Sequence, residues 1–287
     1  MTFNEFALAN EPMIRLTAFI GIFALMAAWE VAAPRRARLH SRAARWTANL
    51  GLVMFNTVLV RLLFPFAAVA FATLAAQRGW GLLNAFMLPD WIALVLAVVA
   101  LDFAIYLQHV MFHAVPALWR LHRVHHADPD FDVTTGARFH PIEILLSMLI
   151  KFAVIAVLGA PATAVLIFEI LLNATAMFNH GNVKLPGGVD AGLRLLLVTP
   201  DMHRVHHYTD NAEANSNFGF NLSIWDRLFG TYRAAARLPQ ESMAIGVAGL
   251  TGDPRCVSLT GMLVIPFVNP GEGYAIGHGP EASHEAR

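Results

Sequence analysis

Residues 142–180 read IEILLSMLIKFAVIAVLGAPATAVLIFEILLNATAMFNH, and this apolar stretch decides the fold because of the break at its centre. Gly159-Ala160-Pro161 is a sequence that ends one helix and starts another, so the stretch is predicted to form a hairpin of two helices. Each arm has about 18 residues, which is near the lower limit for crossing a hydrocarbon core of about 30 Å. The hairpin either crosses the membrane twice or dips into it, and in both cases its two ends return to one side.

Two ionisable residues lie inside this hairpin. Lys151 precedes Ala160 by nine residues and Glu169 follows it by nine, so the two side chains lie at similar depth. An ion pair between them would relieve the cost of placing charges in lipid. In the alternative arrangement, Lys151 extends toward the surface while Glu169 faces a cavity.

Three further apolar stretches, about 13–33, 48–75 and 90–112, are long enough to cross a bilayer. The second is over-long and contains Arg61 and Pro65, which predicts a tilt, a kink or a partly interfacial position. With 56% hydrophobic and 14% charged residues, the chain is too apolar for an ordinary soluble domain. We therefore expect an all-α, polytopic membrane helix bundle with about four to five membrane helices, capped by a histidine-rich cytoplasmic domain.

Charges around the first stretch predict its orientation. The first fourteen residues contain Glu5 and Glu11 but neither Lys nor Arg, whereas a cleaved signal peptide begins with basic residues. A basic run follows the stretch instead, at Arg35, Arg36, Arg38, Arg42 and Arg45. Because basic residues favour the cytoplasmic side, we expect the N-terminus outside and this run in the cytoplasm.

The polar segments, about 113–141 and 181–240, contain the most unusual motif of the chain. The string His122-Arg-Val-His125-His126 recurs 81 residues later as His203-Arg-Val-His206-His207. Histidines at positions i, i+3 and i+4 of a helix fan over about 100°, so their rings can converge on one or two metal ions. The repeated string therefore predicts a metal site.

A third group of histidines ends the third membrane stretch. His109 and His113 are one helical turn apart and share a face with Asp102 and Tyr106. Asp102 is expected to hold the second ring nitrogen of a ligand histidine, which would fix its tautomer.

Further polar residues are weaker candidates for the same site. Asp128 and Asp210 follow the two repeats, either as partners of ligand histidines or as solvated loop carboxylates. His140, in Phe139-His140-Pro141, is either a ligand, a supporting residue or a polar residue at a helix start. The histidines assigned to the surface are His40, His278 and His284.

The hairpin allows all these histidine groups to meet. The chain leaves the third stretch at His113, passes through the hairpin and emerges at His180 on the same side, just before the second repeat. The predicted ligands are His109, His113, His122, His125, His126, His180, His203, His206 and His207. They outnumber the four ligands of one zinc ion and suit two metals, although imidazole binds zinc, iron and copper alike.

In these strings the chain resembles the fatty acid hydroxylase superfamily, which includes sterol desaturases, fatty acid 2-hydroxylases and alkylglycerol monooxygenase. The matching strings are Asp102-Phe103-x-x-Tyr106-x-x-His109-x-x-x-His113, Leu121-His122-x-x-His125-His126, Phe178-Asn179-His180-Gly181-Asn182, Met202-His203-x-x-His206-His207, Asn215-x-Asn217-Phe218-Gly219 and Ile224-Trp225-Asp226-Arg227-Leu228-Phe229-Gly230-Thr231-Tyr232. The resemblance covers about 90–235, and the first two stretches and the tail are not diagnostic.

The resemblance implies a cytoplasmic centre of two iron ions, O2 as co-substrate, and hydroxylation or desaturation of a lipid that enters from the bilayer. Fatty acyl chains, sterols or hopanoids, ether lipids and carotenoids fit this description. Some relatives carry a second histidine shortly after the position of His180, where this chain has Asn182 and Lys184. Water or Asn182 is expected to take the place of the missing ligand on the metal ion near His180.

Each turnover of such an enzyme needs two electrons. The sequence contains no Gly-rich nucleotide fingerprint and only one cysteine, Cys256, which excludes an iron–sulfur cluster from this chain. A separate electron-transfer protein, cytochrome b5-like or ferredoxin-like, is therefore expected to dock.

Two other functions use the same histidines. A zinc-dependent membrane hydrolase would activate water, and a metal transporter would move the ion, although transport favours ionisable residues at mid-membrane depth. A formal net charge of +0 excludes an electrostatic footprint for nucleic acid. The expected organisation is membrane helices in 1–88, a catalytic domain in 89–240, and a tail in 241–287 whose last fifteen residues are disordered.

Overall fold

The computed structural model describes residues 1–86 and 88–268, and these residues form helices with only three isolated β-bridges. The expected disordered end of the tail lies outside these residues. The α-helices are α1 (Phe3–Ala9), α2 (Glu11–Ala32), α3 (Arg42–Leu63), α4 (Ala68–Gln77), α5 (Asp90–Ala114), α6 (Pro116–His126), α7 (Pro141–Leu158), α8 (Ala162–Asn179), α9 (Gly187–Leu193), α10 (Pro200–His206), α11 (Asn211–Ala214), α12 (Ile224–Leu228) and α13 (Leu259–Val264). The 3-10 helices are η1 (Leu82–Ala85), η2 (Thr135–Ala137), η3 (Ala248–Leu250), η4 (Pro254–Val257) and η5 (Ile265–Phe267).

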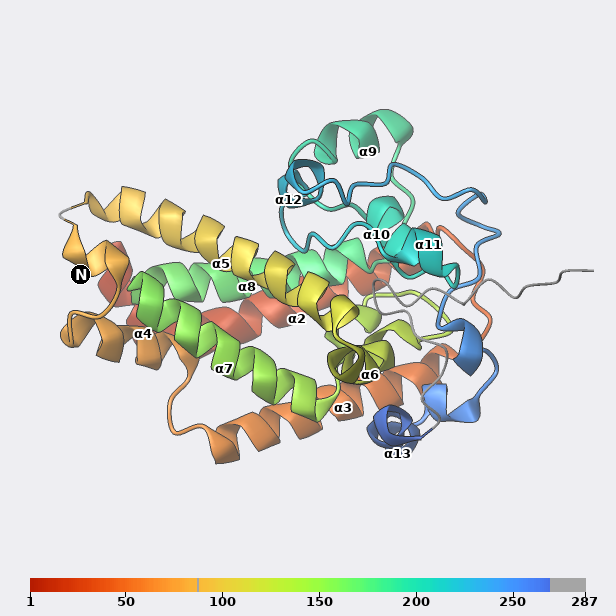
Figure 1. The fold of residues 1–287 in the computed structure, drawn as a ribbon, viewed down its shortest axis with the longest axis horizontal. Coiled ribbons are helices and arrows are strands. Elements are labelled where there is room, and N and C mark those ends of the chain that lie inside the picture. The colour runs from red at the N-terminus through yellow and green to blue at the C-terminus, as the bar shows by residue number, and fades with distance from the viewer. Residues whose placement is uncertain (87, 269–287) are drawn as a thin grey trace, which may run out of the picture.

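Five helical segments are long and apolar enough to cross a membrane: α2, the α3–α4 segment, α5, α7 and α8. These helices run along the long axis, and the short helices α9 to α13 gather toward one end, away from the N-terminus (Figure 1). The all-α membrane helix bundle predicted from the sequence is confirmed, and the chain is an integral membrane protein. Helix α8 is the most buried of the five segments and packs against α2, α4 and α5.

The predicted hairpin consists of α7 and α8. Gly159 ends α7 with a φ of 70°, in the left-handed region that favours glycine, and its N–H donates to the Ile155 carbonyl. A Cβ on Gly159 would lie 2.6 Å from the Trp80 carbonyl oxygen, and one on Gly81 would lie 2.0 Å from the Gly159 nitrogen. Two glycines therefore allow the turn of the hairpin to touch the loop that follows α4.

The second membrane segment differs from the expected single stretch of 48–75. Helix α3 begins earlier, at Arg42, and ends before Phe64, which is extended with a ψ of 118°. Pro65 explains the break, because the residue before a proline is forced out of the helical region and proline itself lacks an N–H. Helix α4 starts at Ala68, and its buried alanines allow close packing against α8.

Glu30 lies near the end of α2 that is predicted to face the cytoplasm. It links this end to the loop that follows α6 and to the loop that follows α8. Its side chain is fully buried, and its Oε1 accepts hydrogen bonds from the Val133 N–H at 2.7 Å and the Asn182 N–H at 2.8 Å. A β-bridge between Pro34 and Val183 continues this contact. The end of α2 therefore fixes the loops on both sides of the hairpin.

Candidate metal centre

Four helices bring nine histidines to one end of the bundle. They come from the end of α5, from α6, from the residue that follows α8, and from α10 with the residue that follows it, and each is buried. Their ring nitrogens form two groups in which one atom per residue lies within 4.8 Å of the others. The first group is His109, His113, His122, His126 and His206, and the second is His125, His180, His203 and His207.

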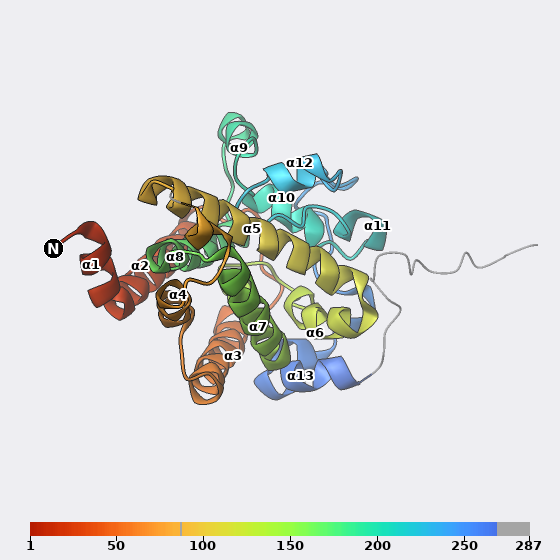
Figure 2. The ribbon, with the colours of Figure 1, turned by 60° about the vertical axis from the view of Figure 1, so that its left-hand side comes forward.

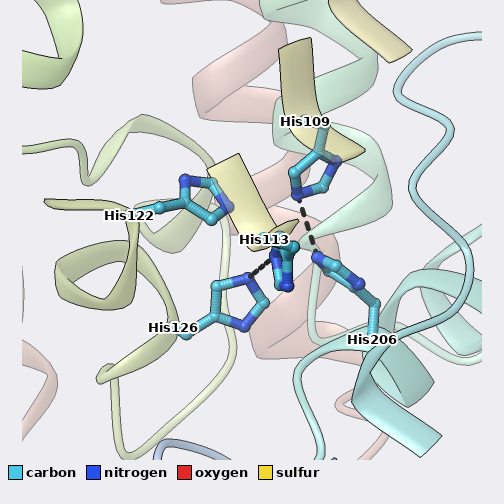
Figure 3. Close-up of side chains that lie close together, drawn as sticks. All are labelled: His109, His113, His122, His126 and His206. Atoms are coloured by element: carbon cyan, nitrogen blue, oxygen red, sulfur yellow. Dashed lines mark hydrogen bonds between the residues drawn. The ribbon is translucent and has the colours of Figure 1, made fainter. Parts of the chain in front are cut away.

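The first group faces inward from α5, α6 and α10 (Figure 3). His109 Nε2 lies 2.9 Å from His206 Nε2, and His113 Nε2 lies 3.1 Å from His126 Nε2. In the second group, His180 Nε2 lies 3.2 Å from His125 Nε2 and 3.1 Å from His203 Nε2. A metal–imidazole bond of about 2.1 Å places two ligand nitrogens about 3.0 Å apart at a right angle and about 3.4 Å apart in a tetrahedron. The observed spacings fit ligands that share an ion.

The outer ring nitrogens show which way the lone pairs point. His109 Nδ1 lies 2.8 Å from the Phe218 carbonyl oxygen, and His206 Nδ1 lies 2.8 Å from the Ser216 carbonyl oxygen. A carbonyl only accepts, so each Nδ1 carries the proton and each Nε2 presents a lone pair. Two lone pairs 2.9 Å apart repel each other unless a cation lies beside both. This pair of tautomers is therefore suited to a metal ion.

Protonation of the rings does not provide that cation. Burial lowers the pKa of His122 and of His180 to about 3. Burial also lowers the pKa of the remaining histidines of the two repeated strings, namely His125, His126, His203, His206 and His207. The rings are neutral near pH 7, and neutral imidazole is the form that binds metals.

Several ring nitrogens have no hydrogen-bond partner among the described residues. They are His122 Nε2, His125 Nδ1, His203 Nδ1 and both nitrogens of His207. Buried polar atoms are normally satisfied, and each exception calls for an explanation. For His122 Nε2 and for one nitrogen of His207, a metal in the adjoining group would provide the missing partner.

Glu143, which the sequence did not single out, supports the first group. Its Oε1 lies 2.7 Å from His122 Nδ1, and both side chains are buried. Histidine ligands commonly donate their second N–H to a carboxylate in this way. The sequence signal was weak, because Glu143 lies in the first turn of α7, where acidic residues are common for the helix dipole alone.

Asp128 is buried but binds arginine and not a histidine. Arg45 donates to its two carboxylate oxygens at 2.7 and 2.8 Å. Burial raises the pKa of Asp128, but the charges of Arg45 and Arg138 outweigh it and lower the pKa to about 2. Both alternatives for Asp128, a histidine partner and a solvated carboxylate, are therefore wrong. Its role is to anchor the start of α3 beneath the loop that follows the first repeat.

Asp102 lacks the expected contact with a histidine, and Tyr106, on the same face of α5, does not contact one through its hydroxyl either. Asp102 Oδ2 accepts from Trp225 Nε1 at 2.8 Å and from the Leu222 N–H at 3.3 Å. The Tyr106 hydroxyl lies 3.0 Å from Thr231 Oγ1. The expectation that Asp102 fixes a histidine tautomer is corrected, because a main-chain carbonyl of the loop that folds over α5 takes this position on His109.

Three other candidates lie outside the two histidine groups. His140 caps α7, since its Nδ1 accepts from the Ile142 N–H at 3.2 Å. Asp210 caps α11 and pairs with Arg237. The Asn182 side chain binds the main chain of Arg36 through both its oxygen and its nitrogen, at 3.0 Å each, so it does not fill a gap beside His180.

The remaining predicted residues lie away from the centre. His40 is exposed, as expected, and His278 and His284 lie outside the described residues. Lys151 Nζ lies 2.6 Å from Glu169 Oε1 within the hairpin. Arg15, from α2, approaches the other carboxylate oxygen of Glu169 at 2.8 Å, a partner that the sequence did not indicate.

Comparisons with known proteins agree with this geometry. Residues 94–231 match the family model of fatty acid hydroxylase. The chain is 32% identical over 193 residues to an ornithine lipid hydroxylase of Rhizobium tropici. The aligned residues make up 67% of this chain and 56% of that protein. It is 29% identical over 143 residues to alkylglycerol monooxygenase of Homo sapiens, which covers 48% of this chain and 30% of that protein. With cholesterol 25-hydroxylase of Mus musculus it shares 25% identity over 156 residues, which is 54% of this chain and 51% of that protein.

The chain thus spans between 30% and 56% of the length of these relatives. No solved structure matches it. The helix bundle with its buried histidine groups defines a membrane protein with a histidine-rich centre. The chain belongs to the fatty acid hydroxylase superfamily.

Proposed function

We propose that this protein is an O2-dependent, di-iron membrane oxygenase that hydroxylates the hydrocarbon part of a lipid. The observation that carries the proposal is the pair of buried histidine groups at the ends of membrane helices. The compared relatives are named hydroxylases or monooxygenases, which favours hydroxylation over desaturation. Their named substrates include an ornithine lipid, an alkylglycerol and a sterol, and these support a lipid substrate class.

In this proposal, each histidine group holds one ion. The five histidines of the first group would hold one iron and the four of the second group the other. Bound iron would supply the activation of O2 and the oxidation of an unactivated C–H bond, which side-chain acids and bases cannot perform. Overall, one substrate C–H bond and O2 are converted, with two electrons and two protons, into an alcohol and water.

The protein supplies position and a dry environment. Phe139 stacks on His125 with ring centroids 4.5 Å apart, and Phe131 stacks on His180 at 5.4 Å. Phe218 packs edge-on against His109 at 5.6 Å. These apolar rings keep water from the imidazoles, and the carbonyls behind His109 and His206 keep each Nε2 directed inward.

The setting fits a substrate that never leaves the bilayer. His109 and His113 lie in the last two turns of the membrane helix α5. A long hydrocarbon chain lying beside α5 would therefore reach the centre without crossing water. We place the centre on the cytoplasmic side, because the arginine run at 35–45 lies at the same end. The two electrons are proposed to come from a cytochrome b5-like or ferredoxin-like protein.

Lipid profiling by mass spectrometry tests this proposal. Cells that express the protein should contain a lipid whose mass is higher by one oxygen atom, and growth under isotopically labelled O2 should place the label in it. A His126→Ala variant should form none of this product while still inserting in the membrane, and a His40→Ala variant should behave as the unmodified protein.

Metal analysis of the purified proteins completes the test. We expect about two iron ions per chain in the unmodified protein and fewer in His126→Ala. A fully active His126→Ala variant with normal metal content would contradict the proposed centre. A product that forms without O2 or reductant would point instead to zinc-dependent hydrolysis.

A further inference from the structure

Helices α9 and α12, and the residues that directly follow each of them, expose large apolar side chains. Among the most exposed are Leu195 at 71%, Leu228 at 64% and Leu196 at 61%. We call this surface the α9–α12 face, and its members are Val189, Leu195, Leu196, Ile224, Leu228 and Phe229. Both views place α9 and α12 on the same flank of α5 (Figures 1 and 2). Large apolar side chains that gather on one flank mark a surface that another apolar phase covers.

Contacts with α5 indicate its depth. The Phe103 ring packs at a tilt against Trp225 and stacks on Phe229, with centroids 4.8 and 5.6 Å apart. Phe103 lies thirteen residues beyond Asp90, where α5 begins, which is about 20 Å along the helix. A hydrocarbon core of about 30 Å extends about 10 Å further. Helix α12 therefore lies against a part of α5 that is inside the bilayer.

Hydrogen bonds join α12 both to α5 and to the segment that follows α9. Trp225 Nε1 donates to Asp102 Oδ2 at 2.8 Å, which fixes α12 to α5 one residue before Phe103. The Ser223 N–H donates to the Leu196 carbonyl at 3.0 Å, so the segment after α9 is held to the start of α12. The exposed leucines that follow α9 are therefore held close to α12.

The edge of the face has the chemistry of a membrane interface. Arg227 is exposed, and its guanidinium lies 3.9 Å over the ring of Tyr232. Aromatic rings and basic side chains are enriched at the level of lipid headgroups. The apolar residues on one side and this pair on the other match an element that lies in the plane of the interface.

We propose that the α9–α12 face is inserted into the surface of the bilayer, at the boundary between headgroups and acyl chains. Interfacial helices commonly bury their apolar side by about 5–10 Å, which agrees with the depth that α5 gives. The covering partner is thus a lipid surface and not another protein.

Insertion would also link the bilayer to the first histidine group. Asp226 of α12 accepts from the N–H groups of Phe218 and Gly219 at 2.7 and 2.8 Å. The Phe218 carbonyl in turn holds His109 Nδ1 at 2.8 Å. Lipid chains beside α12 would then lie next to the side of the centre that His109 forms, a consequence that rests on the proposed function.

Spin labels on two exposed leucines test the insertion. Cys256 is 2% exposed, and a Cys256→Ala background leaves a single label at Leu228→Cys in the face or at Leu238→Cys outside it. Leu238 is 45% exposed and lies between Arg237, which pairs with Asp210, and Gln240, which donates to the Asp201 carbonyl. The two labelled positions are therefore both exposed leucines, but only Leu228 belongs to the α9–α12 face.

The full-length protein would be labelled in nanodiscs of phosphatidylcholine and phosphatidylglycerol, without need for turnover. The label at Leu228 should collide more with O2, which concentrates in lipid, than with a water-soluble nickel chelate, and the label at Leu238 should show the reverse. Equal exposure of both labels to nickel would overturn the proposal. Shielding of the Leu228 label from both reagents would also overturn it, since a second copy of the chain would then cover the face. Leu196→Cys gives an independent position with the same expected result.

Discussion

At the scale of single residues, the histidines of the centre differ in what holds their outer nitrogen. The Nδ1 atoms of His109, His180 and His206 each contact a main-chain carbonyl at 2.8 Å. For His122 this partner is the carboxylate of Glu143, the one such contact to the two histidine groups among residues 1–86 and 88–268. A carboxylate makes the opposite ring nitrogen a stronger base and a stronger ligand.

Replacing Glu143 should therefore weaken metal binding by the first histidine group more than metal binding by the second. In Glu143→Gln the side chain keeps its size and an acceptor oxygen but can no longer ionise, and we expect metal affinity to fall by about 10- to 100-fold. Chelator titration of the purified protein, with iron content measured after each step, provides the readout. Glu241→Gln, which changes an exposed carboxylate, is the control. If Glu143→Gln resists chelator as well as this control, Glu143 only fills space.

At the scale of elements, the hairpin and α2 are joined by charges in a buried position. One carboxylate, Glu169, faces two cations, Lys151 at 2.6 Å and Arg15 at 2.8 Å. Arg15 also contacts Glu11 at 2.9 Å. Such a cluster is costly to bury but more costly to break, since removal of Glu169 leaves the Lys151 charge without its partner in lipid.

This arrangement predicts unequal effects of removing each partner. Glu169→Gln leaves Lys151 without a carboxylate, while Arg15 keeps its contact with Glu11, and should lower the free energy of unfolding by about 3–5 kcal/mol. Lys151→Met should cost less, because Arg15 still pairs with Glu169. Thermal unfolding of the purified protein should show that the double variant loses less stability than the two single losses added together. Strict additivity would mean that Lys151 and Glu169 do not interact.

At the scale of the whole molecule, the two ends of the bundle are distinct. The loop after α2 contacts the histidine end, since the Leu39 N–H donates to Asp130 at 2.9 Å. The loop that contains Gly81 contacts the turn of the hairpin at Gly159, at the opposite end of α7. The two loops therefore report on opposite sides of the membrane.

Orientation can be tested with single cysteines in these loops, again in a Cys256→Ala background. Leu39 and Leu82 are 74% and 59% exposed, so cysteine at either position should be reactive. A membrane-impermeant maleimide should label Leu82→Cys in intact cells and Leu39→Cys only after the membrane is opened. The reverse pattern would place the histidine end outside and refute the orientation predicted from the arginine run.

The sequence by itself determined the helical membrane class, the hairpin and the nine histidines that meet. These features depend on local properties, namely the length of apolar stretches, the break at Gly159 to Pro161, and the spacing of the repeated string. Pro65 allowed a kink to be predicted from the sequence. The structure has two separate helices there, α3 and α4, and the position of α4 depends on its packing against α8.

Tertiary structure alone decided how the histidines divide and what supports them. Each repeat is split: His122 and His126 face one group while His125 faces the other, and only His206 of the second repeat joins the first group. Spacing along a helix fixes the angle between rings but not which distant ring each one meets. The supporting carboxylate is likewise Glu143 and not Asp102, because the crossing of α6 with α7 and the fold of the 215–226 loop over α5 place them there. Such contacts join residues far apart in the chain, and no local pattern encodes them.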